Sequence, residues 1–258
     1  MNVSYYKQWF DQFTDAFMAQ DATTDYPLTL KKIHTQRVCA EILGICDDLK
    51  VSKDISDTAQ MIALFHDLGR FEQYVRYHTF KDAISINHAI QSIRDLAKHR
   101  VLKELSLRHR VLICHAIRYH NVASIPETLD NDKLFFTRLI RDADKLDIWQ
   151  IFIDYYHNRD TVKNEVIELG VQDVPECSPS VLNAVKNGRI GLTSDIKTLN
   201  DIKLVQMGWL YDLNFKFSFK RVKANAFIER LLAILPQTSE IEQLGNHLMA
   251  YRDKKIES

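Results

Sequence analysis

The sequence predicts an all-α fold, and three observations support this prediction. Apolar residues recur at helical spacing through most of the 258 residues. Only 7 glycines and 5 prolines occur, which predicts few tight turns. Alternation typical of a strand extends beyond a few positions only at 214–219, and this stretch also fits a helix. We therefore expect a helical bundle over residues 1–158 and a helical C-terminal extension over residues 159–258, packed on the bundle.

The first two helices are predicted from an aromatic stripe and from a proline placed at a helix start. A helix is expected over residues 4–20 because four aromatic residues share one face, which we assign to the core. These residues are Tyr6, Phe10, Phe13 and Phe17. The next helix is expected over residues 28–48, with Pro27 of the turn Asp25-Tyr26-Pro27 placed to start it.

The third helix ends in the dipeptide His66-Asp67. Residues 52–57 supply capping side chains for it, and Gly69 suits the left-handed position that follows a helix. Residues 71–80 are expected to form a loop rich in aromatic and charged side chains. Asp82 is then expected to cap a helix that continues to Lys98 and has His88 in its middle.

Helical patterns continue to the end of the chain. Two further helices are expected in the bundle, over residues 107–120 and 132–157. The sequence becomes polar over residues 159–200, where Ser178-Pro179 has the composition of a helix start. Apolar stretches then predict helices near 202–213 and 226–235, followed by a polar terminal helix.

Composition excludes several classes of protein. Lys+Arg and Asp+Glu each count 34, so the net charge is zero, which argues against nucleic acid as an obligatory partner. The four cysteines are scattered without a C-x-x-C pair, which is typical of a reducing compartment. We find neither a signal peptide nor an apolar run long enough to cross a membrane. A cytoplasmic protein with no membrane partner is expected.

The dipeptide His66-Asp67 is the strongest sign of a functional site. An imidazole and a carboxylate at the end of a buried apolar helix are costly unless something satisfies both. A divalent transition metal binds neutral histidine nitrogen and ionised aspartate oxygen, so it is the commonest way to satisfy them.

Other helices supply further candidate ligands. Asp144 lies four residues from both Ile140 and Ile148 in an apolar repeat, so a metal or a buried cation explains it better than solvent does. His115 and His120 are five residues apart, a rotation of about 140° on a helix, so both cannot face one centre. His120 lies on the apolar side and is chosen. The full candidate set is His34, His66, Asp67, His88, His120 and Asp144.

This set resembles the H…HD…D signature of the HD-domain metal-dependent phosphohydrolases. The resemblance covers roughly residues 25–157 and rests on His34, His66-Asp67 and Asp144 within the stretch Arg141-Asp142-Ala143-Asp144-Lys145-Leu146-Asp147. His88 and His120 look like the extra ligands of branches that bind two metals. In one such branch two adjacent histidines occur near His120; here Tyr119 replaces the first and the following Gly-Tyr-Pro is missing. The sequence therefore departs from the branch that hydrolyses cyclic dinucleotides.

The resemblance implies a two-metal hydrolase acting on a small phosphate ester such as a nucleotide. Asp67 would bridge two ions, with His34, His66 and Asp144 on one and His88 and His120 on the other. Histidine-rich ligand sets suit Mn, Fe, Co, Ni or Zn better than Mg. Arg70 and Lys145 are candidates to bind the substrate phosphate, and a surface charge is the alternative for each.

Two alternatives remain open for the function. The same ligand order also resembles the mixed-valent di-iron oxygenases built on the HD fold, which use the same six groups. The third interpretation is a non-catalytic sensor with a structural metal. The C-terminal extension can cap the pocket, form a homo-oligomer interface or bury the back of the bundle, and its residues do not decide among these roles.

Overall fold

The computed structural model describes residues 1–18, 22–126, 129–159, 168 and 170–258. These residues form helices and turns; among them no strand occurs, and the β-type pairing is limited to an isolated bridge between Gln172 and Thr198. The predicted all-α fold is confirmed. The chain forms two compact units, Met1–Asp147 and Ile148–Ser258. The division into domains over residues 1–158 and 159–258, and the packing of one on the other, stay predictions.

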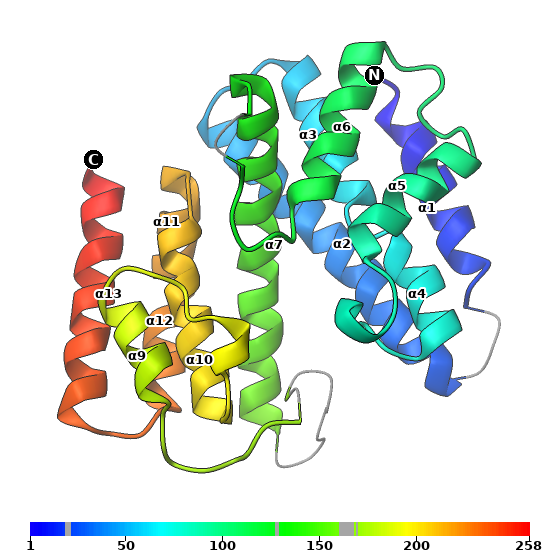
Figure 1. Ribbon diagram of the computed structural model, residues 1–258. Helices are drawn as coiled ribbons and strands as arrows, with labels where there is room; N and C mark the ends of the chain where they lie inside the picture. The colour runs from blue at the N-terminus through cyan, green and yellow to red at the C-terminus, as the bar shows by residue number, and fades with distance from the viewer. Residues whose placement is uncertain (19–21, 127–128, 160–167, 169) are drawn as a thin grey trace. The chain divides into compact units, whose positions relative to one another are not determined.

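The first unit contains the helices that carry the candidate ligands (Figure 1). They are α1 (Val3–Asp15), α2 (Ala22–Asp48), α3 (Lys53–Phe65), α4 (Gly69–Tyr77), α5 (His88–Lys98), α6 (Leu107–Tyr119) and the first part of α7 (Asn131–Asn158). Asn2, Ser52, Asn87 and Ser106 each accept a hydrogen bond from the backbone N–H three residues later, at the starts of α1, α3, α5 and α6. Such caps satisfy backbone donors that a helix start leaves unpaired.

An aromatic part of the core of the first unit lies where α1, α3 and α4 meet. Phe65 and Phe71 are fully buried. Tyr6 packs edge-on against Phe65, with ring centroids 6.4 Å apart, and Phe10 packs against Phe71 in the same way at 6.1 Å. Two residues of the predicted aromatic stripe therefore lie in the core. Burying such a side chain stabilises the unit by about 1.5–3 kcal/mol, which holds α1 across the back of the helices that carry the site.

Two expectations around the His66-Asp67 dipeptide are wrong. Gly69 begins α4 instead of taking a left-handed conformation, and α4 replaces most of the loop expected over residues 71–80. The close approach of α5 explains this glycine, because a Cβ at Gly69 would lie 2.4 Å from the carbonyl oxygen of His88. Close packing between backbones, which the sequence pattern does not encode, decided the structure here.

Two helix starts also differ from the prediction. Asn87, not Asp82, caps α5, so His88 is the first residue of that helix. Asp82 begins the 3₁₀ turn η1 (Asp82–Ile84), where its side chain makes tertiary contacts. Pro27 lies inside α2, which already begins at Ala22, so it removes one backbone donor near the helix start instead of starting the helix. The helix expected over residues 4–20 ends at Asp15, and residues 19 and 20 lie outside the described part.

The second unit contains the rest of α7 and the later helices. These are α9 (Pro179–Lys186), η2 (Thr193–Asp195), α10 (Leu199–Gly208), η3 (Trp209–Asp212), α11 (Lys216–Ala224), α12 (Phe227–Ala233) and α13 (Ser239–Glu257). Pro179 is at the start of α9, as predicted, and the aromatic run at 214–219 leads into a helix. Trp149 is fully buried against Trp209 and Phe227.

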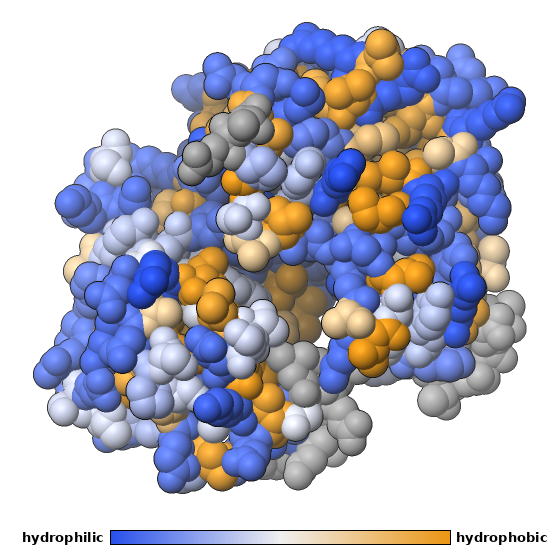
Figure 2. Space-filling view, in the orientation of Figure 1, coloured by the Kyte–Doolittle hydropathy of each residue, from blue (hydrophilic) through white to orange (hydrophobic). Residues whose placement is uncertain are grey.

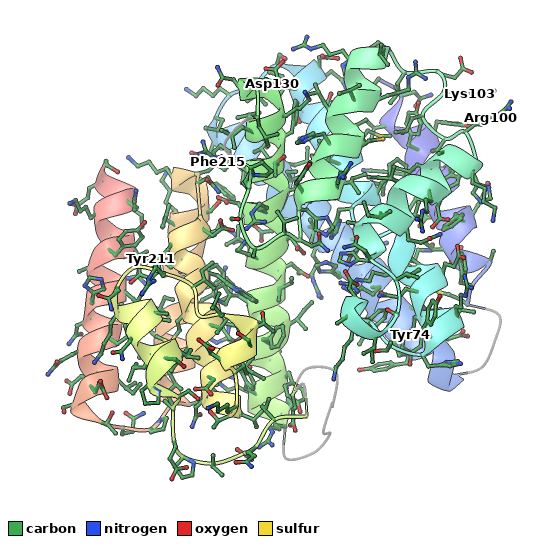
Figure 3. The ribbon with its side chains drawn as sticks, in the orientation of Figure 1. Tyr74, Arg100, Lys103, Asp130, Tyr211 and Phe215 are labelled. Carbon is green, nitrogen blue, oxygen red and sulfur yellow. The ribbon has the colours of Figure 1, made fainter. Side chains whose placement is uncertain are left out.

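Polar side chains cover most of the visible face, and apolar side chains appear there in small separate groups (Figure 2). In the part of the chain that the structure describes, no helix is both long and apolar enough to cross a membrane. Polar contacts also tie the second unit together: the hydroxyl of Tyr211, labelled in Figure 3, donates to the carbonyl oxygen of Val185 at 3.0 Å.

Candidate metal centre

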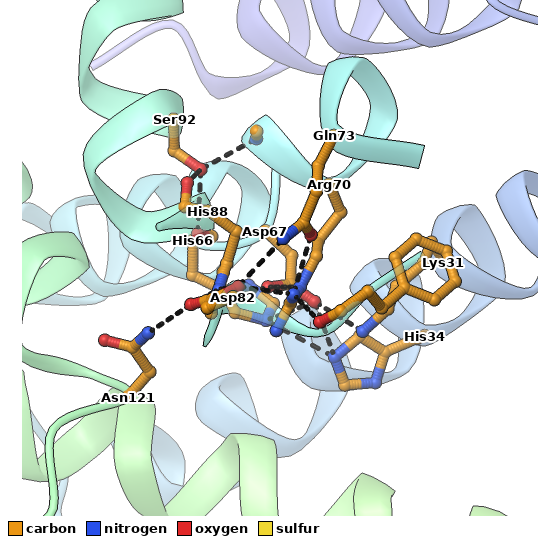
Figure 4. Close-up of polar contacts among 12 residues, drawn as sticks. Lys31, His34, His66, Asp67, Arg70, Gln73, Asp82, His88, Ser92 and Asn121 are labelled. Carbon is orange, nitrogen blue, oxygen red and sulfur yellow. Dashed lines mark hydrogen bonds and ion pairs between the residues drawn. The ribbon is translucent and has the colours of Figure 1, made fainter. Parts of the chain in front are cut away.

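All six candidate ligands lie close together in the first unit. His34 comes from the middle of α2 and Asp144 from the middle of α7, whereas the other four lie at helix ends. His66 caps the end of α3 and Asp67 follows it, His88 starts α5, and His120 caps the end of α6. Figure 4 shows how His34, Asp67 and His88 approach one another from these separate segments.

One pair of histidines lies between two carboxylates. The Nε2 atoms of His34 and His66 are 3.3 Å apart. Asp144 Oδ1 is 3.2 Å from the first Nε2 and 3.7 Å from the second. Asp67 Oδ2 lies on the same pair, at 3.6 Å from His34 and 3.7 Å from His66. Two nitrogens and two carboxylates therefore converge on one point.

A second pair of histidines faces the other oxygen of Asp67. The Nε2 atoms of His88 and His120 are 3.1 Å apart. Asp67 Oδ1 is 3.3 Å from His88 and 3.9 Å from His120. Asp67 thus presents one carboxylate oxygen to each histidine pair, which is the geometry that a bridging ligand requires.

Each of the four imidazoles is oriented through its Nδ1 atom. The Nδ1 of His66 lies 2.8 Å from the carbonyl oxygen of Ala63, and that of His120 lies 2.7 Å from the carbonyl oxygen of Ile117. Because a carbonyl oxygen only accepts, each of these Nδ1 atoms carries the hydrogen and each Nε2 presents its lone pair to the centre. Carboxylates hold the other two histidines in the same way, Asp147 on His34 at 2.6 Å and Asp82 on His88 at 2.7 Å.

Electrostatics at the centre favour neutral imidazoles in the second pair. Burial, together with the neighbouring His88, lowers the pKa of the His120 imidazole to about 3. Burial and the Arg70 cation lower the pKa of His88 as well. At His34 burial also lowers the pKa, but the hydrogen bonds to Asp144 and Asp147 outweigh it and raise the pKa overall. Asp144 and Asp147 therefore favour positive charge on His34.

Both carboxylates at the centre are ionised. Burial raises the pKa of the Asp67 carboxyl, but Lys31 and the surrounding imidazoles outweigh this effect and hold the pKa well below its usual range. Burial likewise raises the pKa of Asp144, and hydrogen bonds with His34 and His66 hold it well below the usual range. Buried anionic oxygens beside neutral imidazole nitrogens are the donor set that a divalent transition metal prefers.

The donor set fits metal ions. Two groups have ligand atoms close enough to hold an ion, namely His34 with His66 and Asp144, and His66 with Asp67 and His120. The second group contains His66 in place of His88, whereas the sequence pairs His88 with His120. The 3.1 Å separation of the His88 and His120 Nε2 atoms keeps His88 within reach of the same ion.

The two candidate substrate-binding cations differ in their surroundings. Arg70 Nη1 donates to Asp82 at 2.9 Å, to Gln73 at 2.7 Å and to the carbonyl oxygen of Phe80 at 2.5 Å. Its Nε lies 3.5 Å from Asp67 Oδ1. Lys145 is half-buried one residue after Asp144, and its ammonium lies 3.5 Å from the carbonyl oxygen of Arg141. Arg70 therefore contacts the candidate ligand Asp67, whereas Lys145 is next to the candidate ligand Asp144 in sequence.

His115 lies apart from the cluster. Its ring packs on Tyr119 at 4.5 Å, and its Nδ1 atom is buried without a hydrogen-bond partner in the structure. The structure brings His120, and not His115, to the other histidines.

Sequence reasoning missed three residues that contact the candidate ligands. Lys31 Nζ lies 2.7 Å from Asp67 Oδ2. Lys31 is three residues before His34 and Asp147 is three residues after Asp144, so both share a helix face with a candidate ligand, and this spacing could have identified them. Asp82 contacts His88 from a loop, where no periodicity applies.

One of the comparisons with known proteins gave a match. Residues 32–149 match the family model of the HD domain, and all six candidate ligands lie within the match. HD domains are typical of metal-dependent phosphohydrolases, and the match implies binding of a divalent metal. Comparisons with curated proteins and with solved structures gave no match. Residues 32–149, a little under half of the chain, thus form an HD domain.

Proposed function

We propose that this protein is a phosphohydrolase that uses two divalent transition-metal ions to cleave a phosphate ester of a nucleotide or another small molecule. The observation that carries the proposal is the position of Asp67, whose two oxygens face two separate pairs of histidine Nε2 atoms. His34, His66 and Asp144 would hold one ion, and His88 and His120 the other. Two bound ions lower the pKa of a shared water and stabilise the charge of a phosphate under attack.

The chain's own residues prepare the site for this chemistry. The four Nδ1 contacts orient each imidazole so that its Nε2 atom faces the centre, where an ion would bind. Burial of Asp67 and the four histidines excludes bulk water and strengthens the electrostatic interactions among them.

Positive side chains next to the centre support a substrate that is an anion. Arg70 and Lys31 both reach Asp67, and Lys145 follows Asp144 in α7. We assign phosphate binding to Arg70 and Lys145. Arg70 Nη1 already has three acceptors, so a phosphate contact from this residue would use the rest of its guanidinium group.

Phosphate release from a panel of esters tests the proposal. Metal-stripped protein is reloaded separately with Mn, Fe, Co, Ni, Zn or Mg and incubated with nucleotides and other phosphate esters. We expect release with at least one transition metal and its loss in Asp67→Ala. Asp11→Ala, which removes an exposed carboxylate paired with Lys32, is the matched control and should keep full activity.

Two results would overturn the proposal, and they are distinguishable. Iron-dependent oxygen uptake without phosphate release would assign the centre to oxygenase chemistry, which uses the same ligands. Bound metal with neither activity would leave a metal-binding sensor.

A further inference from the structure

The carboxylate of Asp82 joins side chains from several segments beside the metal centre (Figure 4). His88 Nδ1 lies 2.9 Å from Oδ1 and 2.7 Å from Oδ2. Arg70 and Gln73, both from α4, each donate to Oδ1 at 2.9 Å. Asn121, which follows α6, donates to Oδ2 at 3.3 Å. One carboxylate thus ties the start of α5 to α4 and to the chain after α6.

The loop that carries Asp82 is held from the inside of the unit. Gln73 is fully buried, and its Nε2 atom also donates to Ser85 Oγ at 2.8 Å and to the carbonyl oxygen of Ile86 at 2.9 Å. Arg70 donates to the carbonyl oxygen of Phe80 in the same loop. Because these contacts fix the loop on both sides of Asp82, its carboxylate has a defined position against His88.

The first histidine pair has a separate support. His34 Nδ1 lies 2.6 Å from Asp147 Oδ2, and Arg37 donates to the other oxygen of Asp147. None of the described hydrogen bonds joins this group to Asp82. The two pairs are built alike, since in each pair a carboxylate orients one histidine and a backbone carbonyl orients the other. Each pair therefore depends on a different acidic residue outside the ligand set.

We propose that Asp82 is a positioning residue that sets the metal affinity of the His88–His120 site alone, and that Asp147 has the same role at the His34–His66 site. The proposal rests on the two-ion centre proposed above. A carboxylate on Nδ1 fixes the ring and makes the other nitrogen more basic, and loss of such a partner typically costs about 10–100-fold in metal affinity. Because the two supports share no residue, each site should weaken without the other.

Calorimetric titration of the metal-free protein with Mn²⁺ tests this independence. The variants are Asp82→Asn and Asp147→Asn, which keep the shape of the side chain and remove its charge. We expect wild type to bind two ions, Asp82→Asn to weaken one site by about 10–100-fold, and Asp147→Asn to weaken the other site by a similar factor. His88→Ala identifies which site belongs to the second pair, and Asp82→Asn should weaken that same site. Asp132→Asn, an exposed carboxylate paired with Arg108, is the matched control and should leave both sites unchanged.

A second measurement does not depend on metal or turnover. Nitrogen-15 NMR of the metal-free wild type should show His88 in the tautomer with hydrogen on Nδ1, and Asp82→Asn should change its nitrogen shifts while those of His34 stay constant. If Asp82→Asn does not fold, the tautomer of wild-type His88 still tests the proposal, because hydrogen on Nε2 in place of Nδ1 would contradict it.

The outcomes separate this inference from the proposed function. Equal weakening of both sites by one substitution, or no weakening by either, would overturn the inference. Site-specific weakening without phosphohydrolase activity would support the inference and count against the function. A wild-type protein that binds no metal would overturn both.

Discussion

Gly69→Ala should destabilise the first unit and disturb the metal centre together. A Cβ at this position would lie 2.4 Å from the carbonyl oxygen of His88, 2.6 Å from the backbone nitrogen of Ser92 and 2.8 Å from the Cβ of Gln91. Two of these neighbours are backbone atoms of α5, so they can yield only if the helix moves.

The expected magnitude follows from these contacts. Overpacking of this kind costs about 1–3 kcal/mol. Movement of α5 also strains the hydrogen bond from the Gly69 N–H to Ser92 Oγ, 2.8 Å long, which contributes about 1 kcal/mol. Alanine regains about 1 kcal/mol of helix propensity, so we expect a net loss of about 1–3 kcal/mol in the free energy of unfolding. Because His88 starts α5, its displacement should also weaken the second metal site.

Urea denaturation and Mn²⁺ titration of the same samples test this prediction. Gly208→Ala is the matched control, since it is also a helical glycine and its Cβ would meet its nearest neighbours at 3.4 Å. A Gly69→Ala protein with wild-type stability and wild-type metal affinity would refute the reasoning, because α4 and α5 could then not be in the contact described here.

Further predictions concern two charged residues. Burial and the nearby Glu72 raise the pKa of the Asp95 carboxyl to about 6. The stability that Asp95 contributes is therefore fully present below about pH 4 and is lost as the pH rises through about 6. Asp95→Asn should raise the free energy of unfolding by about 1–2 kcal/mol at pH 7.5 and leave it unchanged at pH 4. Urea denaturation at both pH values measures this difference. An equal change in the free energy of unfolding at the two pH values would contradict the prediction. Lys31→Met removes the ammonium 2.7 Å from Asp67 Oδ2, so divalent ions no longer compete with it, and calorimetry should show Mn²⁺ binding on the order of tenfold tighter. Unchanged or weaker binding would contradict this competition.

Most of the fold could be predicted because it depends on local patterns. The long apolar repeats in α2 and α7 follow directly from helical spacing, and Pro179 gives the start of α9. Gly69 and Pro27 were interpreted wrongly because their surroundings decide their conformation. The approach of α5 explains the glycine, and Pro27 lies inside α2, which already begins at Ala22.

The site was predictable to the extent that its residues share helix faces. His34 and Asp144 could be identified because each lies on or beside an apolar helix face, where a polar residue needs a partner. Asp82 could not be identified in this way, since its role depends on a loop held by buried hydrogen bonds from Gln73. Lys31 shares a helix face with His34, but a lysine on a helix usually lies in solvent, and only the folded structure brings it to Asp67.

The positions of bound metal ions test the central claim most directly. Crystals of the Mn²⁺-loaded protein, measured at the manganese absorption edge, should show two anomalous peaks on opposite oxygens of Asp67. One peak should lie beside His34, His66 and Asp144, and the other beside His88 and His120. No peak at Asp67, or peaks held by other residues, would contradict the two-metal centre.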